Sequence, residues 1–131
     1  MAAINIVLML LSAGDHVVFS NDLYGGTVRL ANEVYAKYGI EATYVDTSDL
    51  AAVKNALRPT TKLIYIETPS NPMMIISDIR ALADLAHESG ALLAVDNTFL
   101  SPHFQKPLPL GALNLTALSE KFSTTSIRFP S

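Results

Sequence analysis

The sequence predicts an α/β domain built as a three-layer α/β/α sandwich, with helices on both faces of a mostly parallel sheet. Short apolar segments alternate along the chain with segments of helical periodicity, and glycine or proline separates many of them. In addition, residues 91–95 are apolar at every position. A strand that is apolar on both sides has to be covered on both sides, as in a parallel sheet between two helical layers. The order of the elements and this strand therefore indicate the same fold class.

The first 45 residues are expected to contain two helices and two strands. The opening run is interpreted as a buried helix, with apolar positions spaced i, i+3, i+4 and i+7: Ile4, Val7, Leu8 and Leu11. Gly14-Asp15 ends this helix, and strand 16–20 follows. A second helix begins at Gly25-Gly26, ends at Gly39 and should bury one face: Ala31, Val34, Tyr35 and Tyr38. Residues 41–45 are the second expected strand.

The next segment is expected to form a third helix and a third strand. Thr47 or Ser48 is expected to cap this helix, and Pro59 limits its length. Its apolar positions are Leu50, Val53 and Leu57. Residues 62–67 are rich in β-branched and aromatic side chains, which is typical of a strand.

A fourth helix and a fourth strand complete the expected sandwich. Ser77 or Asp78 should cap the helix, which closes at Gly90 and has an apolar stripe: Ile79, Leu82, Ala83 and Ala86. The apolar residues 91–95 are the fourth strand. From Leu113 onward Ser and Thr become frequent and the periodicity weakens, so residues 113–131 are expected to be a divergent, poorly determined tail.

Composition excludes several classes of function. The formal charge of -3 provides no basic stripe for nucleic acid or an anionic membrane, so neither partner is expected. The chain has no cysteine, which excludes disulfides, thiolate metal sites and a cysteine nucleophile and suits a reducing cytoplasm. The opening apolar run resembles a secretory signal only in part, because no Lys or Arg precedes Arg29. The three histidines lack zinc-ligand spacing, so no metal is expected, and no glycine-rich nucleotide motif occurs.

The candidate functional positions follow the expected strands. In open α/β sheets ligands bind beyond the carboxyl ends of the strands. Polar residues occur there at 22–26, 67–72 and 96–98, and again around Lys121.

Six short motifs occur in order along residues 1–112. They are 1–4 (MAAI), 14–17 (GDHV), 22–27 (DLYGGT), 67–72 (ETPSNP), 95–99 (VDNTF) and 107–112 (PLPLGA). Together they resemble the cystathionine γ-synthase and γ-lyase family of trans-sulfuration enzymes, which depend on pyridoxal 5′-phosphate (PLP). The resemblance identifies residues 1–112 as part of the large, PLP-binding domain of a fold type I transferase.

The resemblance assigns four residues to the cofactor ring. Asp96 would hold the ring nitrogen protonated, and Tyr24 would stack on the ring. Asn71 would donate to the phenolic oxygen, and Thr98 would touch the ring. The alternatives are an Asp that caps the turn after its strand, a Tyr that serves packing and an ordinary Asn-Pro turn.

The resemblance is weaker for the phosphate and for the reactive lysine. The amides of Met1 and Ala2, at the start of the first helix, would bind part of the phosphate. Lys121 falls at the position of the family's Schiff-base lysine. However, the hydroxyl-bearing residues that the family has before this lysine are replaced in residues 117–120, and Leu113 stands where the family has an Asp after Gly-Ala. Glu120 would also repel a phosphate. The alternative is a solvated tail lysine.

The expected function is elimination or replacement at the β or γ carbon of sulfur amino acids or activated homoserines. The resemblance implies that an N-terminal arm, the segment after the lysine and a small C-terminal domain lie outside this chain, so we expect a fragment that is inactive alone. Two alternatives stay open: a non-catalytic partner or decoy subunit of a full-length relative, and an unrelated small α/β binding domain. Association as a homo-oligomer or with a full-length relative is compatible with the fragment and with the partner or decoy subunit.

Overall fold

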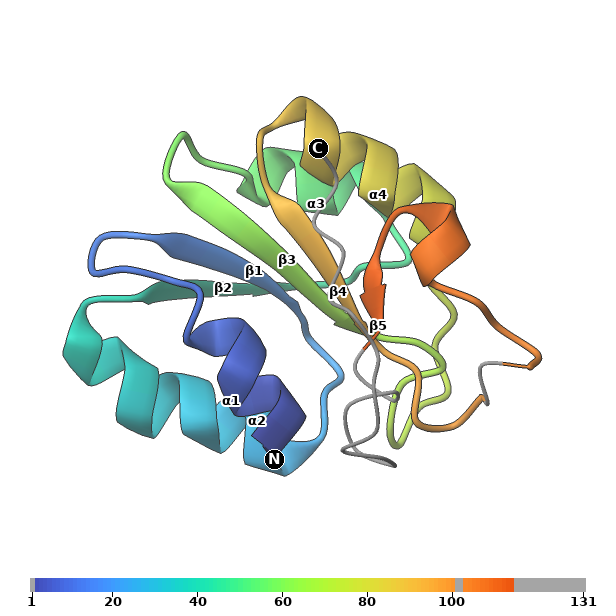
Figure 1. The fold of residues 1–131 in the computed structure, drawn as a ribbon, viewed down its shortest axis with the longest axis horizontal. Coiled ribbons are helices and arrows are strands. Elements are labelled where there is room, and N and C mark those ends of the chain that lie inside the picture. Colours follow the sequence, from blue (N-terminus) through green and yellow to red (C-terminus); the bar gives the residue numbers. More distant parts are fainter. Residues whose placement is uncertain (1, 101–102, 115–131) are drawn as a thin grey trace.

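The computed structural model describes residues 2–100 and 103–114 (Figure 1). The helices are α1 (Ala2–Leu8), α2 (Gly25–Arg29), the π-helical η1 (Leu30–Val34), the 3-10 helix η2 (Tyr35–Tyr38), α3 (Leu50–Ala56), α4 (Ile79–Glu88) and the 3-10 helix η3 (Leu108–Leu110). The strands are β1 (His16–Ser20), β2 (Glu41–Val45), β3 (Thr61–Glu67), β4 (Leu92–Asp96) and β5 (Leu113–Asn114).

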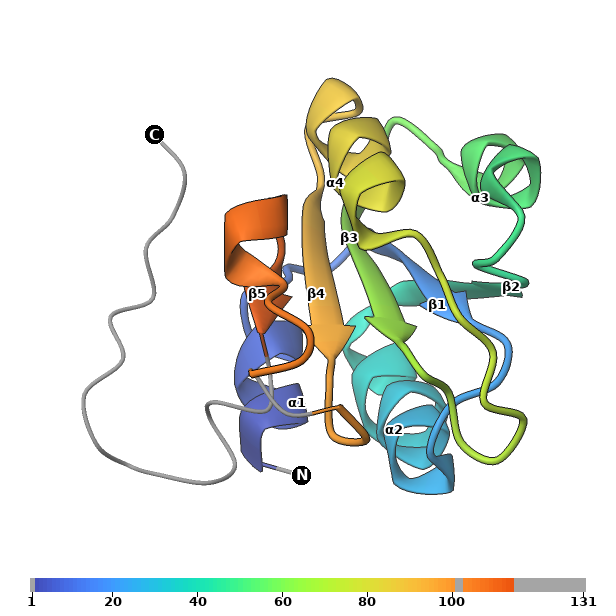
Figure 2. The same cartoon turned by 90° about the vertical axis from the view of Figure 1, so that its right-hand side faces the viewer.

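The five strands form one sheet in which every pairing is parallel, in the order β2-β1-β3-β4-β5. Figures 1 and 2 show α1 and α2 on one face of this sheet and α3 and α4 on the other. The predicted three-layer sandwich is therefore confirmed. The short strand β5 pairs with β4 and lies at the start of the segment expected to be a tail.

Side chains of the strands alternate between two hydrophobic cores. On β1, Val17 and Phe19 pack in the core beneath α1 and α2, whereas Val18 packs in the core beneath α3 and α4. On β3, Leu63 and Tyr65 belong to the first core and Ile64 to the second. Both faces of the central strands are thus buried, which explains why their sequences are apolar without alternation.

The apolar stripe expected on α4 is confirmed, but the predictions of which residues two other helices bury are partly wrong. Val34 and Tyr38 were expected in the core and are exposed, Tyr38 at 67%. The reason is that α2 continues as a π-helix and then a 3-10 helix, so a period of 3.6 residues misplaces the later side chains. Leu50 is also exposed, and α1 ends at Leu8, well before Gly14.

The cap expected at Thr47 or Ser48 is instead provided by Asp49, whose carboxylate accepts from the backbone N–H groups of Ala51 and Ala52. Thr47 is buried, and its hydroxyl lies 2.9 Å from that of Ser20 and 2.8 Å from that of Ser77. For α4 the cap is Asp78, one of the two residues expected.

His16 joins three strands at the amino end of the sheet. Its Nδ1 lies 2.7 Å from Thr61 Oγ1 on β3, and its Nε2 lies 2.8 Å from Thr43 Oγ1 on β2. Burial, and then the nearby Arg58 charge, lower the pKa of this imidazole, whereas Glu41 raises it. The folded chain therefore favours neutral His16.

This arrangement predicts a pH-dependent contribution to stability. The unfolded chain protonates His16 at its ordinary pKa of about 6.5. Because the folded pKa is lower, the stabilisation is present above that pH and is lost as the pH falls below it. We expect the wild type's excess in free energy of unfolding over His16→Gln to shrink between pH 8 and pH 5. Urea unfolding measures this, with the exposed His87→Gln as control, and a constant excess would contradict it.

None of the helices in residues 2–100 and 103–114 has the length and apolar character needed to cross a membrane.

Candidate functional site

The candidate residues lie at the carboxyl ends of the central strands, on the face covered by α1 and α2. Glu67, the last residue of β3, is aligned with Asp96, the last residue of β4. Side chains alternate along each strand, so both carboxylates share the face of Tyr65 and Ala94, which belongs to the first core. This edge is where a parallel sheet presents ligand-binding groups.

Asp96 is held on both of its carboxylate oxygens. The backbone N–H of Thr98 donates to Oδ1 over 3.1 Å, and the Thr98 hydroxyl donates to the same atom. The hydroxyl of Tyr65 donates to Oδ2 across a longer 3.5 Å. Asp96 therefore does cap the turn after β4, as the alternative interpretation has it, but the turn uses only one of its oxygens. Asp96 is half-buried, so its carboxylate is fixed in direction without being sealed from solvent.

Two buried hydroxyls beneath Asp96 were not recognised from the sequence. Tyr65 is fully buried, and burial, followed by the charge of Asp96, raises its pKa well above the ordinary value. The hydroxyl of Thr27 on α2 is also buried, and it has no hydrogen-bond partner among the described residues. Thr27 belongs to the motif 22–27, which was the available signal.

Tyr24 lies at the N-cap of α2, directly after the loop that follows β1. Its side chain is 50% exposed, so its ring is available for stacking and is not needed for the core. Its backbone N–H donates to Glu67 Oε2 over 3.0 Å, which attaches the start of α2 to the end of β3.

Glu67 is a third residue to which the sequence analysis assigned no role, although it opens the motif 67–72. Burial is the largest influence and raises its pKa to about 7. The N–H groups of Tyr24 and Asn71 lower this pKa, whereas the charges of Asp96 and Asp22 raise it. Glu67 thus lies among three of the residues expected to bind the ring.

The loop that carries Asn71 is attached to the end of β1 by Asp22. Asp22 Oδ2 accepts from the Ser70 hydroxyl and, over 3.0 Å, from the backbone N–H of Met73. The Ser70 hydroxyl in turn accepts from Ile75 N–H at 2.9 Å. Asn71, which is half-buried, lies between these anchored residues.

Removing this anchor should loosen the loop. Asp22→Ala leaves the Ser70 hydroxyl and the Met73 N–H without their acceptor, so we expect a loss of stability of about 1–2 kcal/mol. Hydrogen exchange at the Met73 amide should accelerate in parallel. Asp46→Ala is the matched control, because among the described residues the Asp46 carboxylate accepts only from Ser48, two residues along the chain. Equal exchange rates at Met73 in wild type and Asp22→Ala would contradict this.

A further polar pair joins β4 to the following loop. Gln105 Nε2 donates to Asn97 Oδ1 and to the Thr68 carbonyl, both at 2.8 Å, and Asn97 Nδ2 donates back to the Gln105 carbonyl. Gln105 and the buried Asn97 therefore connect the loops that follow β3 and β4.

Of the residues expected to bind the cofactor, Tyr24, Asn71, Asp96 and Thr98 lie at this one edge of the sheet. Ala2 begins α1, which starts on the side toward which the strands point (Figures 1 and 2). Met1 and Lys121 lie outside the described residues.

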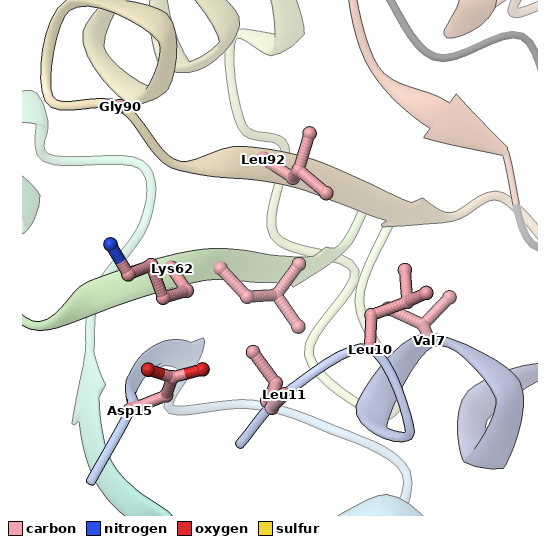
Figure 3. Close-up of a pocket in the computed structure, with 8 residues that line it drawn as sticks. Val7, Leu10, Leu11, Asp15, Lys62, Gly90 and Leu92 are labelled. Atoms are coloured by element: carbon pink, nitrogen blue, oxygen red, sulfur yellow. The ribbon is translucent and has the colours of Figure 1, made fainter.

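The hollow shown in Figure 3 is at the opposite end of the sheet. It has a volume of about 250 Å³ and is lined by Val7, Leu10, Leu11, Asp15, Lys62, Leu63, Gly90 and Leu92. Its strand residues belong to the starts of β3 and β4, so it is separate from the candidate site. Within the part of the chain that the structure describes, no three His, Asp or Glu side chains group as metal ligands.

Comparison with known proteins identifies related enzymes. The model of the family described as Cys/Met metabolism PLP-dependent enzyme matches residues 1–117. Cystathionine γ-lyase of Bacillus subtilis is 55% identical over 112 residues, which cover 86% of this chain and 30% of that protein. O-succinylhomoserine sulfhydrylase of Pseudomonas aeruginosa is 48% identical over 111 residues, covering 85% of this chain and 28% of that protein.

The fold is also found in solved structures. Cystathionine γ-lyase from Lactobacillus plantarum, complexed with L-serine, matches with a TM-score of 0.83 and 56% identity, over 85% of this chain and 29% of that chain. The chain thus spans about 30% of the length of the relatives that it matches.

Proposed function

The chain belongs to the family of Cys/Met metabolism PLP-dependent enzymes, and we propose that it provides the ring-binding part of a PLP site in a trans-sulfuration enzyme. The reaction would be elimination or replacement at the β or γ carbon of a sulfur amino acid or an activated homoserine. Because the chain spans about 30% of its relatives, we propose this reaction for an assembled site and expect the chain alone to be inactive.

The observation that carries the proposal is the position of Glu67. Its carboxylate accepts a hydrogen bond from the backbone N–H of Tyr24, the N–H of Asn71 lowers its pKa, and its residue is aligned with Asp96 on the neighbouring strand. Glu67 thus lies beside three residues that are far apart in the sequence and that the resemblance assigns to the same cofactor ring.

The chemistry of these side chains fits the ring. The carboxylate of Asp96, oriented by Thr98, can accept a charge-assisted hydrogen bond from a protonated ring nitrogen. The exposed Tyr24 offers a stacking surface, and the Asn71 amide can donate to the phenolic oxygen. Bound PLP supplies the electron-withdrawing ring that stabilises a substrate carbanion. Lys121 remains our candidate for covalent attachment of the cofactor.

Two measurements on the whole chain test this proposal. The first is titration with 4′-deoxypyridoxine 5′-phosphate, which has the ring and phosphate but no reactive aldehyde; we expect saturable binding. The second is borohydride reduction after incubation with PLP, followed by peptide mapping. Selective labelling of Lys121, absent in Lys121→Ala, would support it as the attachment site. Labelling scattered over Lys37, Lys54 and Lys62 would reject Lys121, and no binding of the analogue would reject the cofactor site.

A further inference from the structure

The carboxylate of Glu67 has an unusual setting at the end of the central strand β3. The residue is only 4% exposed, and it accepts a 3.0 Å hydrogen bond from the backbone N–H of Tyr24. The other ionisable groups that act on it are Asp96 after β4, Asp22 after β1 and the phenol of Tyr65 on its own strand. Within residues 2–100 and 103–114 no cationic side chain is among them, so an ionised Glu67 is opposed there by two carboxylates and stabilised mainly by backbone N–H groups.

We propose that Glu67 is a positioning residue that couples the placement of Tyr24 to the charge beside Asp96, and that it releases its proton to solvent when a cationic pyridine ring binds there. This inference rests on the proposed function, because it needs the ring to bind at Asp96.

The coupling follows from the neighbours of Glu67. In the free chain the Asp96 carboxylate disfavours an ionised Glu67, and the pKa of Glu67 is about 7. A cationic ring nitrogen paired with Asp96 cancels that repulsion, so the carboxylate form of Glu67 is favoured and its O–H bond breaks, with the proton passing to water. The hydrogen bond from Tyr24 N–H then has a charged acceptor and becomes stronger. Tyr24 is thereby held more firmly when a ring lies beside it.

Proton release upon binding can be measured directly. Calorimetric titration with 4′-deoxypyridoxine 5′-phosphate at pH 7, in buffers of different ionisation enthalpy, gives the number of protons exchanged. With a pKa of about 7, Glu67 is roughly half protonated at this pH, so the wild type should release up to about half a proton more than Glu67→Gln. Glutamine keeps the acceptor for Tyr24 and removes the ionisation. Glu88→Gln is the control, since Glu88 is exposed at the end of α4.

The amide proton of Tyr24 provides a second readout that requires no ligand. Its chemical shift in the free wild type should titrate with a midpoint near neutral pH, and it should lose this step in Glu67→Gln. Absence of the step in the wild type would overturn the inference, even if the variant failed to fold. Binding of the analogue with the same proton release in wild type and Glu67→Gln would overturn the inference and leave the proposed function intact. No binding to the wild type would overturn both.

Discussion

Asp96→Asn is expected to weaken binding of 4′-deoxypyridoxine 5′-phosphate by about 100-fold and to leave the fold unchanged. A hydrogen bond to a charged group contributes about 1.5–3 kcal/mol, and a neutral amide cannot hold the ring nitrogen as a cation. The asparagine oxygen can still accept from the N–H and hydroxyl of Thr98, so the turn after β4 should persist. The dissociation constant, measured by calorimetry, is the readout, and circular dichroism checks the fold.

The control for this variant removes the same charge elsewhere. Asp84 is exposed on α4, which lies in the layer on the other face of the sheet. Asp84→Asn should change the affinity less than twofold, because at about 0.1 M salt the effect of an exposed charge is largely screened beyond about 10 Å. If Asp96→Asn bound the analogue as tightly as the wild type, Asp96 would be only a turn cap.

The fold was predictable because it depends on local periodicity and on burial of whole strands. The apolar stripe of α4 and the apolar residues 91–95 are patterns of residues close together in the sequence, and the stripe is buried in the second core as expected. The errors arise where a distant contact decides. Thr47 has the chemistry of a cap, but its hydroxyl is used by Ser20 and Ser77, so Asp49 caps α3. The π-helical turn after Arg29 likewise has no signal in a pattern of apolar spacing.

The candidate site was predictable only as far as resemblance extends. The motifs identified Asp96, Tyr24 and Asn71, and the strand ends indicated one edge of the sheet for all of them. In the sequence, Glu67 and Tyr65 could not be distinguished from other residues of an ordinary strand. Their roles depend on the register of β3 against β4 and on the position of α2, which are properties of the folded sheet.

Phe19→Ala is expected to lower the free energy of unfolding by about 3–5 kcal/mol, since it removes a fully buried aromatic ring. Phe19 lies on the inner strand β1, with its ring centroid 5.3 Å from that of Tyr44 and 5.5 Å from that of Tyr65. A typical domain is stable by only about 5–15 kcal/mol. The variant should therefore unfold at a much lower urea concentration than the wild type or be unfolded without denaturant.

The same ring connects the core to the site, because Tyr65 packs on Phe19 and donates to Asp96. Phe104→Ala is the control: this ring is 79% exposed, and its loss should change stability by no more than about 0.5 kcal/mol. Phe19→Leu distinguishes loss of the fold from loss of support for Tyr65. Leucine keeps much of the apolar volume, so the variant should fold, but it has no aromatic ring to pack against Tyr65. If Tyr65 orients Asp96, this folded variant should bind the ring analogue more weakly than the wild type. Unchanged affinity would mean that Thr98 alone suffices to orient the carboxylate.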